Sequence, residues 1–131
     1  MKNLTQACPC GSQTAYSFCC SRFLSGMQTA STPEELMRSR YTAYSLADIG
    51  YIQRTMKPPA ALGFKPEEAF EWANSINWLR LEVIKTSCQG IKGSVEFKAY
   101  YQSSKKEFCI HEVSEFRLEE GSWYYVDGTM K

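Results

Sequence analysis

Two periods of hydrophobic residues divide this chain. Between Thr32 and about residue 76, apolar side chains recur every three or four positions, the period of a helix that is buried on one side. From Trp78 onward they alternate with polar side chains, the period of a strand with one buried face. The pattern predicts an α+β domain in which helices precede an antiparallel sheet.

The helical half carries clear start signals. Thr32 is a favourable N-cap, a proline occupies the first helical position, and Glu35 completes a capping box, so a helix is predicted from there to about residue 46. A short second helix is predicted over 51–56, before a pair of prolines that would end it. Pro66 and the two glutamates after it open a third.

The alternating half contains three turn signals. They lie at 89–93, 103–106 and 119–122, where glycine, serine and charged residues separate the apolar runs. Three turns between alternating segments predict a four-stranded antiparallel meander. The fold class is therefore three helices packed on a four-stranded antiparallel sheet.

Composition places the chain among ordinary globular proteins. It has 131 residues, of which 44% are hydrophobic and 22% charged, with a formal net charge of +1. No apolar run approaches the length of a membrane helix, and residues 1–7 lack the apolar stretch of a secretory signal. We expect a cytoplasmic protein with no membrane partner. A charge near zero also argues against a basic nucleic-acid-binding surface.

Four of the six cysteines fall within thirteen residues, in the pattern C-x-C-x8-C-C. Cys8, Cys10, Cys19 and Cys20 could bind one structural zinc ion tetrahedrally through four thiolates. A disulfide between the adjacent Cys19 and Cys20 would be strained, and one between Cys8 and Cys10 is nearly as tight. Crossed pairings (Cys8–Cys19 with Cys10–Cys20) stay open, but they require an oxidising compartment.

The cysteines define a separate N-terminal module. Residues 1–27 are too few to bury a core of their own, so this module should fold only with its metal. Tyr16, Phe18 and Phe23 are expected to form an apolar knob that packs on the metal loop or on the next domain. The second domain is predicted over 32–131.

The cysteine motif, with its CPCGS start and final Cys-Cys pair, resembles the SEC-C motif, the zinc module named for the C-terminus of the SecA translocation ATPase. Residues 36–41 (LMRSRY), 111–116 (HEVSEF) and 123–128 (WYYVDG) resemble the YchJ family of small bacterial proteins. That resemblance implies a nuclear-transport-factor-2-like, cystatin-like domain, in which helices and a curved sheet enclose a conical pocket. Because the SecA module contacts a partner protein and the ribosome, it also implies a protein or ribosomal partner.

Several polar residues are predicted on the apolar face of the last hairpin. If the turn at 119–122 has four residues, strict alternation places Glu112, Ser114, Tyr125 and Asp127 on the same inward face. Buried polar groups must be hydrogen-bonded, ion-paired or hydrated. These residues therefore mark the candidate pocket.

Arg40 is a second polar residue on an inward face, because it lies in the apolar stripe of the first predicted helix. We expect it to reach Glu112 or Asp127 across the pocket. A β-bulge near Val113 would shift the register and remove this expectation. Two interpretations stay open: a structural ion pair between helix and sheet, or a ligand-binding or catalytic pocket.

The first functional interpretation is a non-enzymatic binding protein. Its zinc module would recognise a partner, and its conical domain would act as a scaffold or a small-ligand pocket. The alternative is a small isomerase-, dehydratase- or hydrolase-like enzyme with Asp127 or Glu112 as general base, which fold analogy allows but does not establish. A nucleic-acid-associated protein ranks third.

The remaining chemically notable residues are interpreted structurally. Alternation puts His111, the only histidine, on the face opposite Glu112, where it is expected to be solvated or at an interface. Cys88 and Cys109 are predicted to be small apolar fillers. The three tryptophans are expected in the core.

Overall fold

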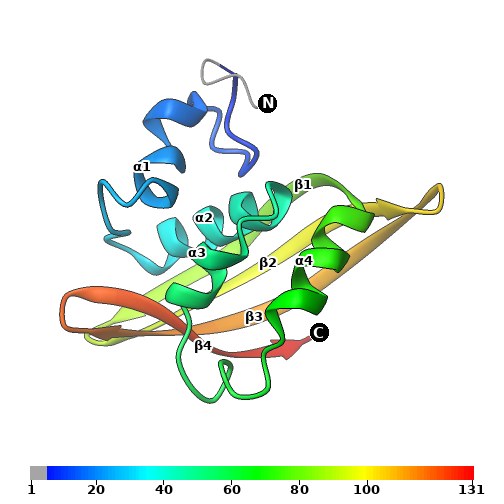
Figure 1. Ribbon diagram of the computed structural model, residues 1–131. Coiled ribbons are helices and arrows are strands. Elements are labelled where there is room, and N and C mark those ends of the chain that lie inside the picture. Colours follow the sequence, from blue (N-terminus) through cyan, green and yellow to red (C-terminus); the bar gives the residue numbers. More distant parts are fainter. Residues whose placement is uncertain (1–5) are drawn as a thin grey trace.

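The computed structural model describes residues 6–131 and consists of helices on one face of a single sheet. The helical elements are η1 (Tyr16–Phe18), α1 (Ser21–Leu24), α2 (Pro33–Ser45), α3 (Ile49–Arg54) and α4 (Pro66–Ser75). The strands are β1 (Asn77–Gln89), β2 (Lys92–Ser103), β3 (Lys106–Glu119) and β4 (Ser122–Met130). Figure 1 shows α2, α3 and α4 in front of the sheet, with the N-terminal module above α2.

The three main helices confirm the sequence prediction. At the start of α2, Thr32 Oγ1 accepts a hydrogen bond of 3.1 Å from the backbone N–H of Glu35, as a capping residue should. At α3, the carboxylate of Asp48 accepts one of 3.1 Å from the N–H of Tyr51, so this helix begins two residues earlier than predicted. No helix in residues 6–131 is long and apolar enough to cross a membrane.

The sheet is the predicted antiparallel meander, with strand order β1-β2-β3-β4. In the last hairpin Leu118 pairs with Trp123 and Phe116 with Tyr125, as the four-residue turn requires. The register then shifts, because Glu115 pairs with Asp127 and leaves Val126 as an extra residue on β4. This β-bulge changes which side chains of β4 face inward beyond residue 125.

The main core lies between the inner face of the sheet and α2 and α3. Its most deeply buried side chains include Leu36, Ala43, Ile52, Val95 and Phe116. Of the tryptophans, Trp123 is buried and Trp78 packs against this core, whereas Trp72 is 38% exposed.

The two isolated cysteines are not in the core. Cys88 and Cys109 are both exposed, so the prediction that they fill the core is wrong. Cys109 precedes the inward-facing Ile110 and therefore points outward, and Cys88 lies near the end of β1, opposite Gly93.

Candidate functional site

The four clustered cysteines converge on one point. The sulfur atoms of Cys8, Cys10, Cys19 and Cys20 all lie within 4.8 Å of one another, and all four residues are buried. The Sγ atoms of Cys10 and Cys19 are 3.6 Å apart, well beyond the roughly 2.05 Å of a disulfide, and all four are free thiols. Such a set of soft sulfur ligands could hold a single metal ion.

A short folded-back loop brings these sulfurs together. The N–H of Cys8 donates to the carbonyl of Thr14 (2.9 Å), and Ala7 forms a bridge with Ala15, which closes the loop that contains the first two cysteines. Gly11 turns this loop at a φ of +82°, a conformation that favours glycine. Cys19 and Cys20 lie between η1 and α1. The carbonyl of Cys20 accepts hydrogen bonds from the backbone N–H groups of the following helical turn.

Hydroxyl groups also contact the sulfurs. Ser12 Oγ lies 3.0 Å from the sulfur of Cys19, and Thr42 Oγ1, from α2, lies 3.6 Å from that of Cys8. Thiols this close influence one another's ionisation. Contacts from the Cys10 and Cys20 thiols place the pKa of Cys8 far below its usual range, whereas contacts with Cys10 and Cys8 and then burial place the pKa of Cys20 far above it. The four thiols therefore do not all ionise by themselves, and holding all four as thiolates would require a cation among them.

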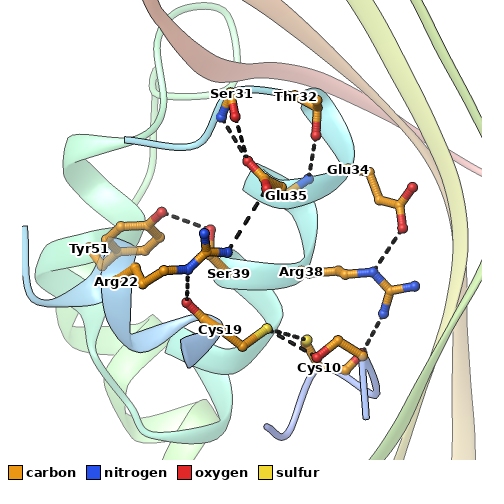
Figure 2. Close-up of polar contacts among 11 residues, drawn as sticks. Cys10, Cys19, Arg22, Ser31, Thr32, Glu34, Glu35, Arg38, Ser39 and Tyr51 are labelled. Atoms are coloured by element: carbon orange, nitrogen blue, oxygen red, sulfur yellow. Dashed lines mark hydrogen bonds and ion pairs between the residues drawn. The ribbon is translucent and has the colours of Figure 1, made fainter. Parts of the chain in front are cut away.

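Two arginines attach this module to α2 (Figure 2). Arg38 donates from Nη1 to the carbonyl of Cys10 (2.7 Å) and from Nε to the carboxylate of Glu34 (2.9 Å). Arg22 donates from Nε to the carbonyl of Cys19 (2.9 Å) and lies 3.9 Å from a carboxylate oxygen of Glu35. The backbone of the cysteine loop is thus anchored to the first turns of α2.

The aromatic residues of the module divide into two groups. Tyr16 and Phe23 are buried, at 8% and 4% exposure, as expected for the packed apolar side chains of this module. Phe18 is 75% exposed, so its predicted packing on the loop or the next domain is wrong. It immediately precedes Cys19, at the outer surface of the module.

A cavity of about 180 Å³ lies between α2, α4 and the inner face of the sheet. Its walls are mainly aromatic and include Tyr41, Tyr44, Trp72, Trp78 and Phe97. Arg40, Glu112, Ser114 and Tyr125 also line it, so the structure brings together four of the five residues named from sequence as a pocket.

Glu112 occupies the polar end of this cavity. Its Oε2 atom accepts hydrogen bonds from the hydroxyls of Ser114 (2.6 Å) and Tyr125 (3.0 Å). Burial and then the neighbouring Glu112 charge raise the pKa of Tyr125, and burial raises the pKa of Tyr41 to about 12. The tyrosine hydroxyls in the cavity wall therefore stay protonated at neutral pH.

Arg40 does not make the predicted ion pair. Its Nη1 donates to the carbonyl of Ile52 (2.9 Å) and to Thr55 Oγ1 (2.7 Å), and its guanidinium lies 4.6 Å from the centre of the Tyr125 ring. Within residues 6–131, no carboxylate lies within 4 Å of it. Burial lowers the pKa of Arg40. Tyr125 contacts both polar groups, Arg40 through its ring and Glu112 through its hydroxyl.

Asp127 lies outside the pocket, so its predicted inward orientation is wrong. The bulge at Val126 rotates it to the outer face of the sheet, where it is exposed and its carboxylate accepts from the N–H of Gly128 (2.9 Å). His111 also lies on that face, with Nε2 2.7 Å from a carboxylate oxygen of Glu96. This hydrogen bond lowers the pKa of Glu96.

Two tryptophans form part of the cavity wall, which the sequence did not predict. Trp72 and Trp78 line the cavity, and their ring centres are 5.3 Å apart in an edge-to-face arrangement. Trp78 Nε1 is the one buried side-chain nitrogen or oxygen of the described residues without a hydrogen-bond partner. The sequence places both residues in the core, because hydrophobic periodicity does not distinguish a packed interior from the wall of a cavity.

Gly128 is required for the arrangement around Glu112. A Cβ atom added there would overlap Glu112 Oε2 and the hydroxyl of Tyr125. We expect Gly128→Ala to break this hydrogen bond and to lower the free energy of unfolding by about 1–3 kcal/mol, measured by urea denaturation. The matched control is Gly50→Ala in α3, where the nearest atom is 3.7 Å away and no loss is expected. Equal stability of the two variants would contradict the packing described here.

Comparison with known proteins identifies relatives that cover nearly all of the chain. A family model described as the YchJ middle NTF2-like domain matches residues 32–128. A UPF0225 protein from Geobacter sulfurreducens is 41% identical over 128 residues, which cover 95% of this chain and 80% of that protein. A UPF0225 protein from Enterobacter sp. strain 638 is 43% identical over 129 residues, covering 96% and 84%.

Solved structures agree with these relatives. The solution structure of a SEC-C motif containing protein from Rhodopseudomonas palustris has a TM-score of 0.88 at 38% identity, and the match covers 95% of this chain and 98% of that one. A crystal structure of another, from Psychrobacter arcticus, has a TM-score of 0.84 at 29% identity, covering 98% and 84%. A calcium/calmodulin-dependent kinase II association domain from Thiobacillus denitrificans, at 10% identity and a TM-score of 0.61, shows the same fold alone; it covers 79% of this chain and 96% of that one.

Proposed function

This chain belongs to the YchJ family, and from that premise we propose that it is a zinc-binding interaction protein. In this proposal the N-terminal module recognises a protein or ribosomal partner, and the NTF2-like domain supports it and holds a small ligand. The observation that carries the proposal is the convergence of four buried cysteine sulfurs within 4.8 Å.

The spacing of the sulfur atoms suits a zinc ion. Zinc–sulfur bonds of about 2.3 Å in a tetrahedron put neighbouring sulfurs about 3.8 Å apart. The 3.6 Å between the sulfurs of Cys10 and Cys19 is close to that value. Four thiolates would leave no open coordination position, so the zinc would be structural and would fix the loop on α2.

Phe18 is the residue that we assign to partner binding. Exposed aromatic side chains are enriched at the centres of protein interfaces, and this one is 75% exposed beside a zinc ligand. The metal loop would hold it in one position, which lowers the entropic cost of binding.

The enzyme alternative is weakened by the geometry of the two candidate bases. Asp127 is exposed on the outer face of the sheet. Glu112 Oε2 already accepts hydrogen bonds from two protein hydroxyls, so this oxygen is engaged and is poorly placed to take a proton from a substrate.

Ribosome co-sedimentation tests the proposal. We expect the zinc-loaded chain to sediment with bacterial ribosomes, and Phe18→Ser to reduce the bound fraction about tenfold with the zinc content unchanged. Met27→Ser is the matched control, because Met27 is 82% exposed but lies beyond α1. Absence of co-sedimentation, or equal losses for both variants, would argue against a ribosomal partner.

A further inference from the structure

The cavity in the NTF2-like domain combines an aromatic wall with buried hydrogen-bond donors. Tyr41, Tyr44, Trp72 and Trp78 form a continuous set of rings, with centres 5.3–6.3 Å apart in successive contacts. Such rings bind the faces and edges of other planar rings favourably. Trp72 is 38% exposed, so this wall extends from the cavity to the surface beside α4.

The donors in this cavity lack enough acceptors. Arg40 is 6% exposed, and among the described residues only its Nη1 donates to protein oxygens. Its Nε and Nη2 have no protein acceptor, but they are not fully buried and can be reached by a molecule in the cavity. Trp78, which also lines the cavity, has a buried Nε1–H without a partner. A buried donor without an acceptor is unfavourable, and a largely buried cation gains from every anion or acceptor that reaches it. The two groups come from α2 and β1, and both line the cavity.

The cavity's one carboxylate does not supply these acceptors. Glu112 Oε2 is already bonded to the hydroxyls of Ser114 and Tyr125, and no ion pair joins Glu112 to Arg40 in the described part of the chain. A bound molecule with acceptor oxygens would pair with the donors that the protein leaves free on Arg40 and Trp78.

We propose that this cavity binds a small aromatic carboxylate. Its carboxylate accepts hydrogen bonds from Nε and Nη2 of Arg40 and from the Nε1–H of Trp78, and its ring packs against Tyr44 and Trp72. A cavity of about 150 Å³ can hold benzene, so about 180 Å³ suits a molecule with one ring. The inference rests on the small-ligand role in the proposed function, and it names the chemical class of that ligand.

An aromatic wall with a carboxylate can also bind organic cations. The charged groups of the cavity therefore decide whether an anion or a cation binds. Here the buried guanidinium of Arg40 would repel a cation. The hydroxyls of Ser114 and Tyr125 already donate to the Glu112 carboxylate, whereas Nε and Nη2 of the guanidinium have no protein acceptor. The charged group with free donors is therefore the guanidinium of Arg40, and it would bind an anion.

Three single-ring probes that differ in charge test this inference. Benzoate, benzyl alcohol and benzylamine are each titrated into the full zinc-loaded chain, with tryptophan fluorescence and NMR shifts as readouts. We expect benzoate to bind at least tenfold more tightly than benzyl alcohol, and benzylamine to bind more weakly than either. Benzylamine binding most tightly, equal affinities for all three, or no benzoate binding at millimolar concentration would overturn the proposal.

Substitutions in the cavity make the test specific. Arg40→Met should reduce benzoate affinity tenfold or more and leave benzyl alcohol affinity unchanged. Glu112→Gln keeps an acceptor for the two hydroxyls but removes a negative charge, so benzoate should bind severalfold more tightly. Weaker benzoate binding by Glu112→Gln would contradict the assignment.

Trp78→Phe is a second variant for the same test. It is needed because Arg40→Met also removes the hydrogen bond to Ile52 and can disturb the packing there. Trp78→Phe keeps a ring and removes the Nε1–H donor, and it should lower benzoate affinity severalfold without affecting benzylamine. An unchanged benzoate affinity would overturn the role of Trp78. Zinc content and ribosome co-sedimentation are measured on the same samples. Failure of benzoate binding with both properties intact would contradict this inference alone.

Discussion

Replacing Cys10 with serine is expected to abolish zinc binding and to lower the free energy of unfolding by about 4 kcal/mol or more. Cys10 is fully buried, its sulfur lies 3.6 Å from that of Cys19, and its carbonyl accepts the 2.7 Å hydrogen bond from Arg38. Loss of the metal would release the loop and remove the arginine's partner. Urea denaturation and metal analysis of the same preparation measure the two effects.

The matched control is Cys109→Ser, which makes the same chemical change at an exposed thiol on the outer face of the sheet. It should keep one zinc per chain and change stability by less than about 0.5 kcal/mol. A Cys10→Ser protein that retains stoichiometric zinc and wild-type stability would contradict the proposed ligand set.

Replacing Phe97 with alanine is expected to lower the free energy of unfolding by about 3–5 kcal/mol. Phe97 comes from β2, is 6% exposed, and forms part of both the core and the cavity wall. Its loss would leave a void that the surrounding strands and α2 can fill only in part. The midpoint and slope of a urea unfolding curve give the change in free energy.

Phe108→Ala is the control for this experiment. Phe108 lies on the same face of the sheet, paired through β2 with Tyr101, but it is 43% exposed near the β2–β3 turn. We expect a smaller loss of about 1–2 kcal/mol, since nearly half of its surface stays in water on folding. Equal losses of free energy for both variants would contradict the placement of Phe97 in the core.

The local signals in the sequence predicted most of the fold. Thr32 and Glu35 fix the start of α2 through contacts within one helical turn, and the alternation in each strand records which face of the sheet is buried. These are short-range effects, so they can be read without knowing the partners of each element. The cysteine spacing was informative for the same reason, because all four ligands come from one short loop.

The inner face near the end of β4 could not be predicted in this way. Strict alternation put Asp127 beside Glu112, but a single extra residue, Val126, reverses the orientation of every side chain beyond it. No local sequence signal marks this bulge. Gly128 does not mark it, because a glycine is as compatible with close packing against other side chains as with a bulge. The close packing of Gly128 on Glu112 and Tyr125 becomes visible only when both strands are in place.

The partners of Arg40 depended on tertiary packing as well. Its position in the stripe of α2 predicted burial, which is what the structure shows. Its hydrogen bonds go to Ile52 and Thr55, at the end of α3, because that helix packs against α2. A sequence pattern gives the orientation of a side chain on its own helix but does not give the neighbour that it meets.

Native mass spectrometry of the gently purified, unmodified chain tests the central claim most directly, because one spectrum reports both bound metal and cysteine oxidation. We predict one zinc ion per chain, with the four clustered cysteines reduced and protected from alkylation until a chelator is added. A metal-free mass with Cys10 joined to Cys19 or Cys20 through a disulfide would contradict it.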